Sequence, residues 1–359
     1  MSQNIHIRRI KDSRLSTIDF NNIPFGKTFS DHMFMADYVN GEWTNIEIKP
    51  VEPFLVHPGN LAWHYGQSIF EGMKATVDRD RNPLLFRPEE HIYRLNASAR
   101  RMCMPEFPEQ LFLDAVHTLV DMEKDWIPPS EGSALYIRPF MFATDETIGV
   151  RPSDNYKFII FTMPVGPYYP KPVHLKAETT YVRAAQGGVG EAKTAGNYAA
   201  SLYPAKLANE QGFDQLMWLD AKEFKYVQEV GTMNIFFVID GKVVTPSTDG
   251  TILKGITRKS LIEILKYEGY EVEERNVSID ELVEAYDAGK LSEVFGSGTA
   301  AVISKAARLH YEGKDMIFDP ENYEVAEKAK SIINGMRSGR LEDPFGWVVP
   351  VKNPSAVVV

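Results

Sequence analysis

The chain has 359 residues, enough for about two domains of ordinary size. Hydrophobic residues make up 44% and charged residues 25%, which excludes a chain that is disordered throughout. The net charge of −10 argues against a nucleic-acid-binding surface, and no apolar run approaches the ~18 residues that cross a membrane. The single cysteine, Cys103, excludes an internal disulfide framework and a zinc site built on several thiolates.

The beginning of the chain is polar and irregular, without the apolar segment of a secretory signal. Arg8, Arg9 and Arg14 hint at a transit peptide, but Asp12 and Asp19 oppose that interpretation. We therefore expect a cytoplasmic protein.

Strand and helix signals alternate through the first half. Asn40-Gly41 between apolar residues predicts a hairpin turn. Residues 83–86 are typical of a short strand, and Pro88 suits the first turn of a helix that begins there. A second helix over about 108–124 and strands over 134–143 and 156–164 follow from the spacing of the apolar residues.

A proline-rich stretch, residues 164–175, interrupts this series. Proline removes backbone donors and stiffens the chain, so the stretch is the best candidate for a linker, with an ordinary long loop as the alternative. We therefore expect a smaller N-terminal α/β domain over 1–163, a linker over 164–178, and a larger C-terminal domain over 179–359.

The second half is expected to begin with a strand over 179–184 and a glycine-rich turn. Gly212 should end a helix over 198–211, in which Pro204 would cause a bend. Further signals predict strands over 215–220 and 226–230, a hairpin at Asp240-Gly241, a helix over 257–268, a helix capped by Ser278 and Glu281, and a strand–turn–strand over 292–304. Alternating elements with many hairpins indicate an α+β (mixed α/β) fold with largely antiparallel or mixed sheets.

Two kinds of chemistry can be weighed from motifs alone. The eight histidines include no pair at helical ligand spacing, so we expect no metal. Residues 187–194, GGVGEAKT, nearly match the nucleotide loop G-x-x-x-x-G-K-[ST], and Asp220 ends a hydrophobic strand as a magnesium-binding aspartate would. Ala192 stands where that loop needs glycine, and Gly196 and Asn197 are poor helix formers. An NTPase is retained as the minority alternative.

Two further segments offer backbone N–H groups to an anion. FGSGTAA, residues 295–301, predicts a tight glycine turn, although strand-like sequence follows it and not the helix of a dinucleotide fingerprint. Gly255, Ile256 and Thr257 open a predicted helix, whose N-terminus carries unpaired N–H groups. A glycine hairpin without a ligand and an ordinary helix start remain the alternatives.

Two charged residues stand in unusual surroundings. Lys193 lies among small residues in EAKTAGNY, where partial burial would lower its pKa and make the amine nucleophilic. A solvated loop lysine is the alternative. Glu229 lies between apolar residues in VQEVGTMN, where a buried carboxylate needs a facing cation such as a protonated ring nitrogen. An edge-strand glutamate that faces water is the alternative.

Seven segments, taken together, resemble the branched-chain aminotransferases. These segments are PFGKTFSDHMF, HYGQSIFEGMKA, LFRPEEHIYRLNASARRMCMP, LYIRP, GEAKTAGNYAASLYPAK, QEVGTMNIFF and FGSGTA. They occur in matching order from about Phe25 to Ile303, most of the chain. The resemblance implies a two-domain, D-amino-acid aminotransferase-like enzyme of fold type IV that uses pyridoxal 5′-phosphate, with the cofactor lysine in the C-terminal domain.

The resemblance assigns roles around that cofactor. Lys193 would be the Schiff-base lysine and proton shuttle, and Glu229 would keep the pyridine nitrogen protonated. Tyr198 would hydrogen-bond the ring 3-oxygen, and Arg94 would bind the phosphate. The remaining residues on the phosphate side would be Thr232, Ile256, Thr257 and Thr299. Helical periodicity alone would place Arg94 on a solvent-exposed face.

The resemblance also implies the reaction, a ping-pong transamination between L-leucine, L-isoleucine or L-valine and 2-oxoglutarate. Tyr65, Thr299 and Ala300 would hold the α-carboxylate, and Arg138 would assist 2-oxoglutarate. An apolar pocket that binds the aliphatic side chain, at ~0.8 kcal/mol per buried CH₂, would be lined by Phe25, Tyr65, Phe70, Tyr136, Val150 and Tyr168. The loop near Gly149 reaches the partner subunit's site in this family, which implies a homodimer.

Other functions stay open beside this one. A D-amino-acid aminotransferase or an aminodeoxychorismate lyase would share Lys193 and Glu229, although the long first half and the apolar pocket residues oppose both. A non-catalytic relative would bind the cofactor as a scaffold. Ala301 and Ser304 stand where some animal members of the family carry a C-x-x-C pair, so we expect no thiol switch there.

Overall fold

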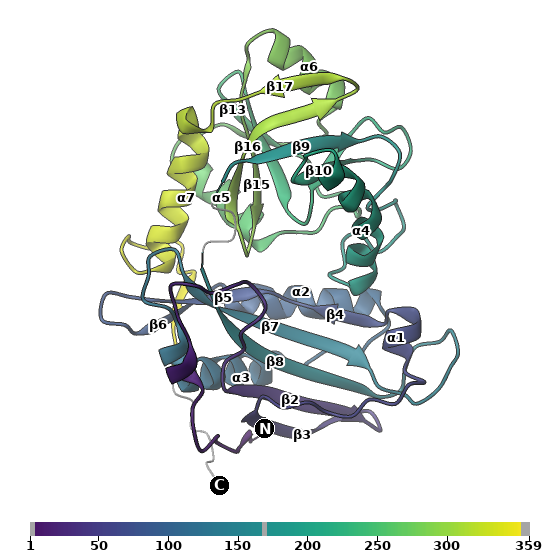
Figure 1. Cartoon of the computed structure of the whole chain (residues 1–359), viewed down its shortest axis with the longest axis vertical. Helices are drawn as coiled ribbons and strands as arrows, with labels where there is room; N and C mark the ends of the chain where they lie inside the picture. The colour runs from purple at the N-terminus through teal and green to yellow at the C-terminus, as the bar shows by residue number, and fades with distance from the viewer. Residues whose placement is uncertain (1–3, 167–170, 353–359) are drawn as a thin grey trace. The chain divides into compact units, whose positions relative to one another are not determined.

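The computed structural model describes residues 4–166 and 171–352. The chain divides into two compact units, shown in Figure 1. Unit 1 takes the described residues of Met1–Tyr168, Ala192–Ala195 and Asn334–Val359, and unit 2 those of Tyr169–Glu191 and Gly196–Ile333.

This division differs from the expected domains in three ways. The change of unit lies inside the expected linker, 164–178, but β9 (Val173–Glu178) is already a strand of the unit 2 sheet. Two later segments return to unit 1, because Thr194 forms a bridge with Ile69 and the C-terminal strand pairs with a strand of the first sheet. Unit 1, expected to be the smaller, is therefore the longer one, and it contains Lys193.

Unit 1 is built on a sheet of nine described strands in the order β1-β3-β2-β8-β7-β5-β6-β18, with β4 also paired to β7. The β1–β3 pair is parallel and the others are antiparallel. Asn40 and Gly41 connect β2 to β3 with φ values of 54° and 84°, the left-handed backbone of the predicted hairpin turn. The strands are β1 (His6–Ile7), β2 (His32–Val39), β3 (Glu42–Pro50), β4 (Ser68–Phe70), β5 (Met73–Val77), β6 (Pro83–Phe86), β7 (Ala134–Ala143), β8 (Tyr156–Val165) and β18 (Val348–Pro350).

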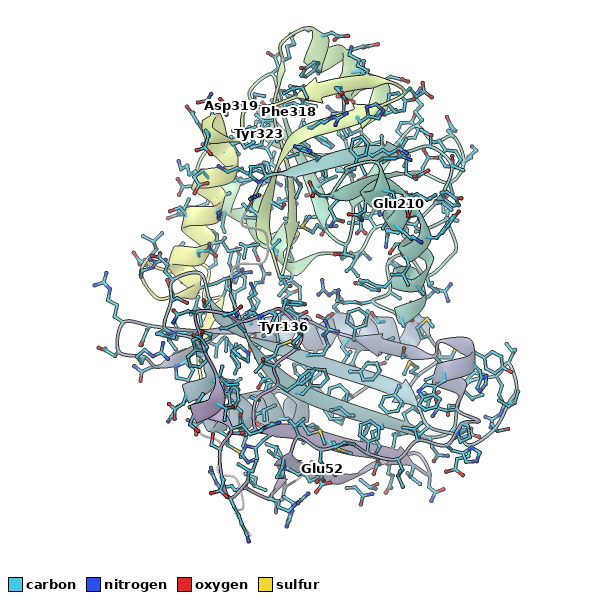
Figure 2. All side chains as sticks on the ribbon, viewed as in Figure 1. Glu52, Tyr136, Glu210, Phe318, Asp319 and Tyr323 are labelled. Atoms are coloured by element: carbon cyan, nitrogen blue, oxygen red, sulfur yellow. The ribbon has the colours of Figure 1, made fainter. Side chains whose placement is uncertain are left out.

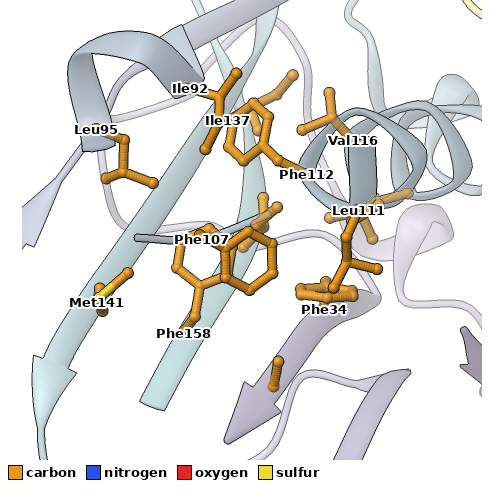
Figure 3. Close-up of a cluster of buried hydrophobic side chains, with 14 of the residues drawn as sticks. Phe34, Ile92, Leu95, Phe107, Leu111, Phe112, Val116, Ile137, Met141 and Phe158 are labelled. Atoms are coloured by element: carbon orange, nitrogen blue, oxygen red, sulfur yellow. The ribbon is translucent and has the colours of Figure 1, made fainter. Parts of the chain in front are cut away.

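Two helices of unit 1, α2 (Pro88–Arg101) and α3 (Glu109–Met122), bury their apolar stripes in the main core of this unit. Figure 3 shows Ile92 and Leu95 beside Phe107, Phe112 and strand residues. The rings of Phe107 and Phe158 have centroids 4.0 Å apart, as in a tightly packed aromatic pair. The remaining helices are α1 (Leu61–Tyr65), η1 (Leu15–Thr17) and η2 (Lys124–Trp126).

Unit 2 also contains a sheet of nine described strands, in the order β11-β10-β9-β16-β15-β12-β13-β14, with β17 paired to β16. It is mixed, because β9 runs parallel to both of its neighbours and β13 runs parallel to β14. Asp240 and Gly241, with φ values of 52° and 79°, form the predicted turn between β12 and β13. The strands besides β9 are β10 (Gln215–Leu219), β11 (Val227–Val230), β12 (Asn234–Ile239), β13 (Lys242–Thr245), β14 (Val272–Glu274), β15 (Leu291–Gly298), β16 (Val302–Tyr311) and β17 (Lys314–Ile317).

The helices of the second half follow the predicted signals closely. The Ser278 hydroxyl accepts the N–H of Glu281 at 3.0 Å and begins α6 (Ile279–Asp287), as the capping pattern predicts. α4 (Ala195–Glu210) continues through Pro204, and Gly212 beyond its end has a φ of 84°. Figure 2 labels Phe318, Asp319 and Tyr323, which precede α7. The other helices are α5 (Ile256–Tyr267), η3 (Pro320–Asn322) and α7 (Glu324–Arg337), which begins in unit 2 and ends in unit 1.

One predicted strand is wrong. Residues 179–184 form no strand, because the strand lies directly before them as β9, paired with β10 and β16. Among the helices of the described residues, none combines the length and apolarity needed to cross a lipid bilayer.

Candidate active site

Lys193 lies on a short segment whose backbone is held on both sides within unit 1. Its carbonyl oxygen accepts the N–H of Phe70 at 3.0 Å, and its own N–H donates to the Ser98 hydroxyl at 2.9 Å. The buried Thr194 hydroxyl donates to the Ser68 carbonyl oxygen at 2.7 Å. The segment is therefore fixed against β4 and α2, and the Lys193 ammonium nitrogen lies 4.9 Å from the centre of the Phe70 ring.

Arg94 corrects the expectation from helical periodicity. Its side chain is only 11% exposed and forms a side-on pair with the fully buried Glu71 carboxylate. Arg94 Nε lies 2.7 Å from Glu71 Oε1, and Arg94 Nη2 lies 2.8 Å from Glu71 Oε2. Periodicity counts polar residues as outward-facing, and it could not foresee a carboxylate that follows β4, far away in the sequence.

Charge pairing dominates the surroundings of Arg94. Burial alone would raise the pKa of the Glu71 carboxyl, but Arg94 and then His91 hold that pKa well below its usual range. His91 Nδ1 lies 2.8 Å from Glu71 Oε2. Burial lowers the pKa of His91, which Glu71 opposes, so the ring stays neutral and donates to the carboxylate.

Two more buried cations lie in unit 1. Burial, reinforced by Arg337, lowers the pKa of Lys74 to about 7. The Arg337 guanidinium lies over the Phe86 ring at 4.4 Å, and burial lowers its pKa to about 10. Lys74 is the register partner of Tyr136 across β5 and β7, which places it beside an expected substrate residue. Sequence reasoning missed both cations.

The expected substrate residues on β4 and β7 come together with Phe25. The Arg138 guanidinium donates through Nη2 to the Tyr136 hydroxyl at 3.2 Å and lies 4.7 Å above the Phe70 ring. The Phe25 ring meets the Tyr136 ring edge-on, with centroids 5.6 Å apart. Figure 2 labels Tyr136. A Cβ at Gly72 would lie 2.0 Å from the Tyr136 hydroxyl, so glycine is required there.

Three expected substrate residues are not joined to this group. Tyr65, at the end of α1, is 43% exposed, and its ring faces His64 at 6.1 Å. Val150 is 89% exposed in the loop before β8. Tyr168 lies outside the described residues. Their proposed roles in substrate binding stay predictions.

Within unit 2, Glu229 on β11 is buried, which excludes a glutamate that faces water. Its Oε1 accepts the backbone N–H of Leu253 at 2.9 Å and the Asn234 amide at 3.2 Å. Its Oε2 lies 3.0 Å from Nε of Arg183, whose side chain is also buried. These partners fix both oxygens and stabilise the ionised carboxylate.

Asn234 links Glu229 to the start of α5. Its amide also donates to the Leu253 carbonyl oxygen at 2.9 Å. A Cβ at Gly255 would lie 1.9 Å from Asn234 Oδ1, so only glycine allows this approach. Gly255 is the N-cap residue of α5 and makes no side-chain cap, so the first turn, with buried Ile256 and Thr257, offers N–H groups suited to a phosphate.

The turns that carry Thr232, Thr299 and Ala300 lie at the same end of two neighbouring strands. Asn234 at the start of β12 pairs with Ser297 near the end of β15. A Cβ at Gly296 would lie 2.8 Å from Met233 Cε, so the two turns are packed closely. The glycine turn joins β15 to β16 as a hairpin, as the sequence predicts.

Tyr198 lies half-buried in the first turn of α4. Its neighbour Asn197 donates to the Val189 carbonyl oxygen at 2.9 Å, which fixes the glycine-rich turn to the helix start. The role of Tyr198 toward the ring 3-oxygen stays a prediction.

The nucleotide-loop alternative fails on geometry. The Asp220 carboxylate accepts the backbone N–H groups of four residues of the following turn, at 2.7–3.1 Å, which lower its pKa. It therefore anchors a turn and is not available as a magnesium ligand. Lys193 and Thr194 are bonded to β4 and α2, whereas a nucleotide loop would leave its backbone N–H groups for phosphates.

Sequence reasoning missed Glu71 and Ser98, although both lie in segments that carried the resemblance. Glu71 is a lone carboxylate among apolar neighbours, the same signal that singled out Glu229. Ser98 lies four positions after Arg94, hence on the same face of α2, and it is buried. Together the described residues hold an amine, a buried carboxylate and several anion donors, a donor set that fits pyridoxal phosphate.

Comparisons with known proteins agree with this chemistry. The amino-transferase class IV family model matches residues 68–309. The probable branched-chain-amino-acid aminotransferase of Staphylococcus aureus (strain N315) is 49% identical over 357 residues, covering 98% of this chain and 99% of the relative. Branched-chain-amino-acid transaminase 1 of Bacillus subtilis (strain 168) is 48% identical over 339 residues, covering 93% and 95%.

Solved structures are also similar. The Escherichia coli branched-chain amino acid aminotransferase superimposes with a TM-score of 0.71 at 28% identity, covering 90% of this chain and 99% of that one. A bacterial branched-chain amino acid aminotransferase designated T.th., solved with pyridoxamine 5′-phosphate, gives a TM-score of 0.73 at 27% identity, with the same coverage. The same T.th. enzyme complexed with N-(5′-phosphopyridoxyl)-L-glutamate gives 0.72 at 26% identity, again with that coverage.

Proposed function

This chain belongs to the branched-chain-amino-acid aminotransferases of amino-transferase class IV, and we propose that it transfers the amino group reversibly between L-leucine, L-isoleucine or L-valine and 2-oxoglutarate. The family's cofactor is pyridoxal 5′-phosphate, which when bound supplies the electron sink for the α-carbon. The observation that carries the proposal is the fixed backbone of Lys193, held by Phe70 and Ser98.

Each cofactor residue has a role that its surroundings support. Lys193 binds the cofactor covalently through Nζ and moves the substrate's α-proton. The carboxylate of Glu229, held ionised by Arg183, keeps the ring nitrogen protonated. Tyr198 hydrogen-bonds the ring 3-oxygen, and Arg94 binds the phosphate. Further phosphate donors are Thr232, Ile256, Thr257 and Thr299.

The substrate residues divide by chemistry. Tyr65, Thr299 and Ala300 hold the α-carboxylate, and Arg138 meets the distal carboxylate of 2-oxoglutarate. Arg138 is suited to this because it is partly buried against Phe70 and Tyr136, so its charge is poorly screened. The aliphatic side chain is bound by the apolar residues Phe25, Tyr65, Phe70, Tyr136, Val150 and Tyr168.

The assembly and location are proposals as well. Ile148 and Val150 are 60% and 89% exposed in one loop, and such apolar side chains are suited to a partner subunit. We propose a homodimer in which this loop reaches the partner, in the cytoplasm, without nucleic-acid or membrane partners.

An amino-donor panel with 2-oxoglutarate tests the function. Glutamate should form from leucine, isoleucine and valine at similar rates, because an apolar pocket distinguishes one methylene poorly. Aspartate, lysine and D-alanine should be poor donors. A preference for D-alanine would indicate a D-amino-acid aminotransferase, and no turnover with any branched-chain donor would contradict the proposal.

A further inference from the structure

The fully buried carboxylate of Glu71 has no role in the reaction described above. We propose that Glu71 is a positioning residue: it fixes the Arg94 guanidinium in the orientation that binds the cofactor phosphate. This inference rests on the proposed function, since it concerns how the phosphate is recognised.

The geometry of the pair carries the first step. Arg94 uses its Nε–Nη2 edge for Glu71, at 2.7 and 2.8 Å. A side-on pair with two parallel hydrogen bonds fixes the plane of the guanidinium as well as its position. It therefore also fixes the direction in which the Nη1 edge faces. A lysine, as a point charge, would not be oriented in this way.

Neighbouring bonds fix the carboxylate itself. Glu71 is 0% exposed, its Oε2 also receives His91 Nδ1 at 2.8 Å, and the N–H of Gly72 lies 3.3 Å from the same oxygen. The backbone N–H of Glu71 donates to the Pro139 carbonyl oxygen at 2.8 Å. Glu71 thus has little freedom to turn away, and its orientation is passed on to Arg94.

The same clamp also serves Lys193. Ser68 and Phe70, directly before Glu71, hold Thr194 and the Lys193 backbone. Arg94 and Ser98, on one face of α2, meet Glu71 and Lys193 respectively. Residues 68–71 therefore position the arginine and the lysine from one rigid stretch of chain.

A structural ion pair is the competing explanation, and phosphate selectivity separates the two. Pyridoxal lacks the phosphate but keeps the ring and the aldehyde. A positioning role predicts that loss of Glu71 weakens binding of pyridoxal phosphate and leaves binding of pyridoxal unchanged. A role in folding alone predicts that both ligands are affected equally.

The test is the dissociation constant of each ligand for the wild-type chain and for Glu71→Gln, measured by absorbance titration of the apoenzyme. In the variant, the amide NH₂ opposes one guanidinium N–H, so the two-bond pair cannot form. We expect pyridoxal phosphate to bind about 10- to 100-fold more weakly, the worth of one or two charged hydrogen bonds. Glu90→Gln is the matched control, since Glu90 pairs with Arg87 on the same helix at 3.3 Å and should leave both constants unchanged.

Two further variants keep the test decisive. Glu71→Asp retains the buried charge but withdraws the carboxylate by one methylene, and it should show the same selective loss if Glu71→Gln fails to fold. In an Arg94→Gln background, Glu71→Gln should cause no further selective loss. An unchanged constant for pyridoxal phosphate, or equal weakening of both ligands, would overturn the inference. A wild-type chain that binds neither ligand would instead contradict the proposed function.

Discussion

The Lys193 N–H donates to the Ser98 hydroxyl at 2.9 Å, four residues along α2 from Arg94. This bond connects the backbone of the proposed cofactor lysine to the helix that carries the proposed phosphate ligand. Ser98 is 2% exposed, so the bond is shielded from water. We expect it to fix the height of the lysine relative to α2.

Ser98→Ala should therefore lower activity without unfolding the chain. Loss of one buried hydrogen bond costs about 1 kcal/mol, or about fivefold in kcat/KM for leucine. Thr118→Val is the control, because the Thr118 hydroxyl donates to the Asp114 carbonyl oxygen within α3 at 2.7 Å, outside the site. Steady-state rates of both variants decide the matter, and equal rates would show that the Ser98 bond does not position Lys193.

Gly72→Ala tests the close approach of Tyr136. The new Cβ would lie 2.0 Å from the tyrosine hydroxyl, so Tyr136 must move and its bond from Arg138 must break. Overpacking of this kind costs about 1–3 kcal/mol. We expect a raised KM for 2-oxoglutarate and a lower Tm. Gly166→Ala, where a Cβ meets no atom within 4 Å, should change neither; a normal KM in Gly72→Ala would remove Tyr136 from the substrate site.

Glu229→Gln tests the electron sink. The amide keeps the size of the carboxylate but cannot hold the ring nitrogen protonated, so the cofactor should remain bound while turnover falls about 10²- to 10⁴-fold. Glu223→Gln, a half-exposed residue of the same unit, should behave as wild type. Cofactor content by absorbance and turnover with leucine are measured together. A near-normal rate would contradict the role of Glu229.

Much of the architecture could be predicted from local signals. The hairpins at Asn40-Gly41 and Asp240-Gly241 and the Ser278 cap each depend on a few adjacent residues, and each is confirmed. The strand expected over 179–184 is wrong, because its apolar pattern continues that of β9 and only the pairing with β10 and β16 decides which part extends. Pairing of distant strands is not visible to a local pattern.

The site divides along the same line. The resemblance identified Lys193, Glu229 and Arg94 from short motifs, and the structure shows the Glu229 carboxylate and the Arg94 guanidinium to be buried and paired. The partners of these two groups, Glu71 and Arg183, escaped notice, because they lie 23 and 46 positions away in the sequence. Such partners become visible only when the sheets and α2 are in place.

Lys74 should make stability depend on pH. Its pKa falls from 10.5 to about 7 on folding, so the unfolded chain binds more protons between these values. Stability therefore rises with pH through this window, by at most about 1.4 kcal/mol per pH unit. The ammonium is tolerated least below pH 7.

Lys74→Met removes this titration. Its Tm should exceed that of the wild type at pH 6.5, and the difference should shrink by pH 9.5. Lys222→Met, whose side chain is 88% exposed, is the control and should follow the wild type at both values. A Tm difference for Lys74→Met that is the same at both pH values would show that Lys74 is not buried in its charged form.

The covalent attachment of the cofactor is the central claim, and borohydride reduction tests it most directly. The holoenzyme is reduced with sodium borohydride, digested, and mapped by peptide mass. We predict that the phosphopyridoxyl mass is found on the peptide that contains Lys193, and that Lys193→Ala carries no such tag and lacks the cofactor's absorbance band. A tag on another lysine, or none in a reduced holoenzyme, would contradict the account.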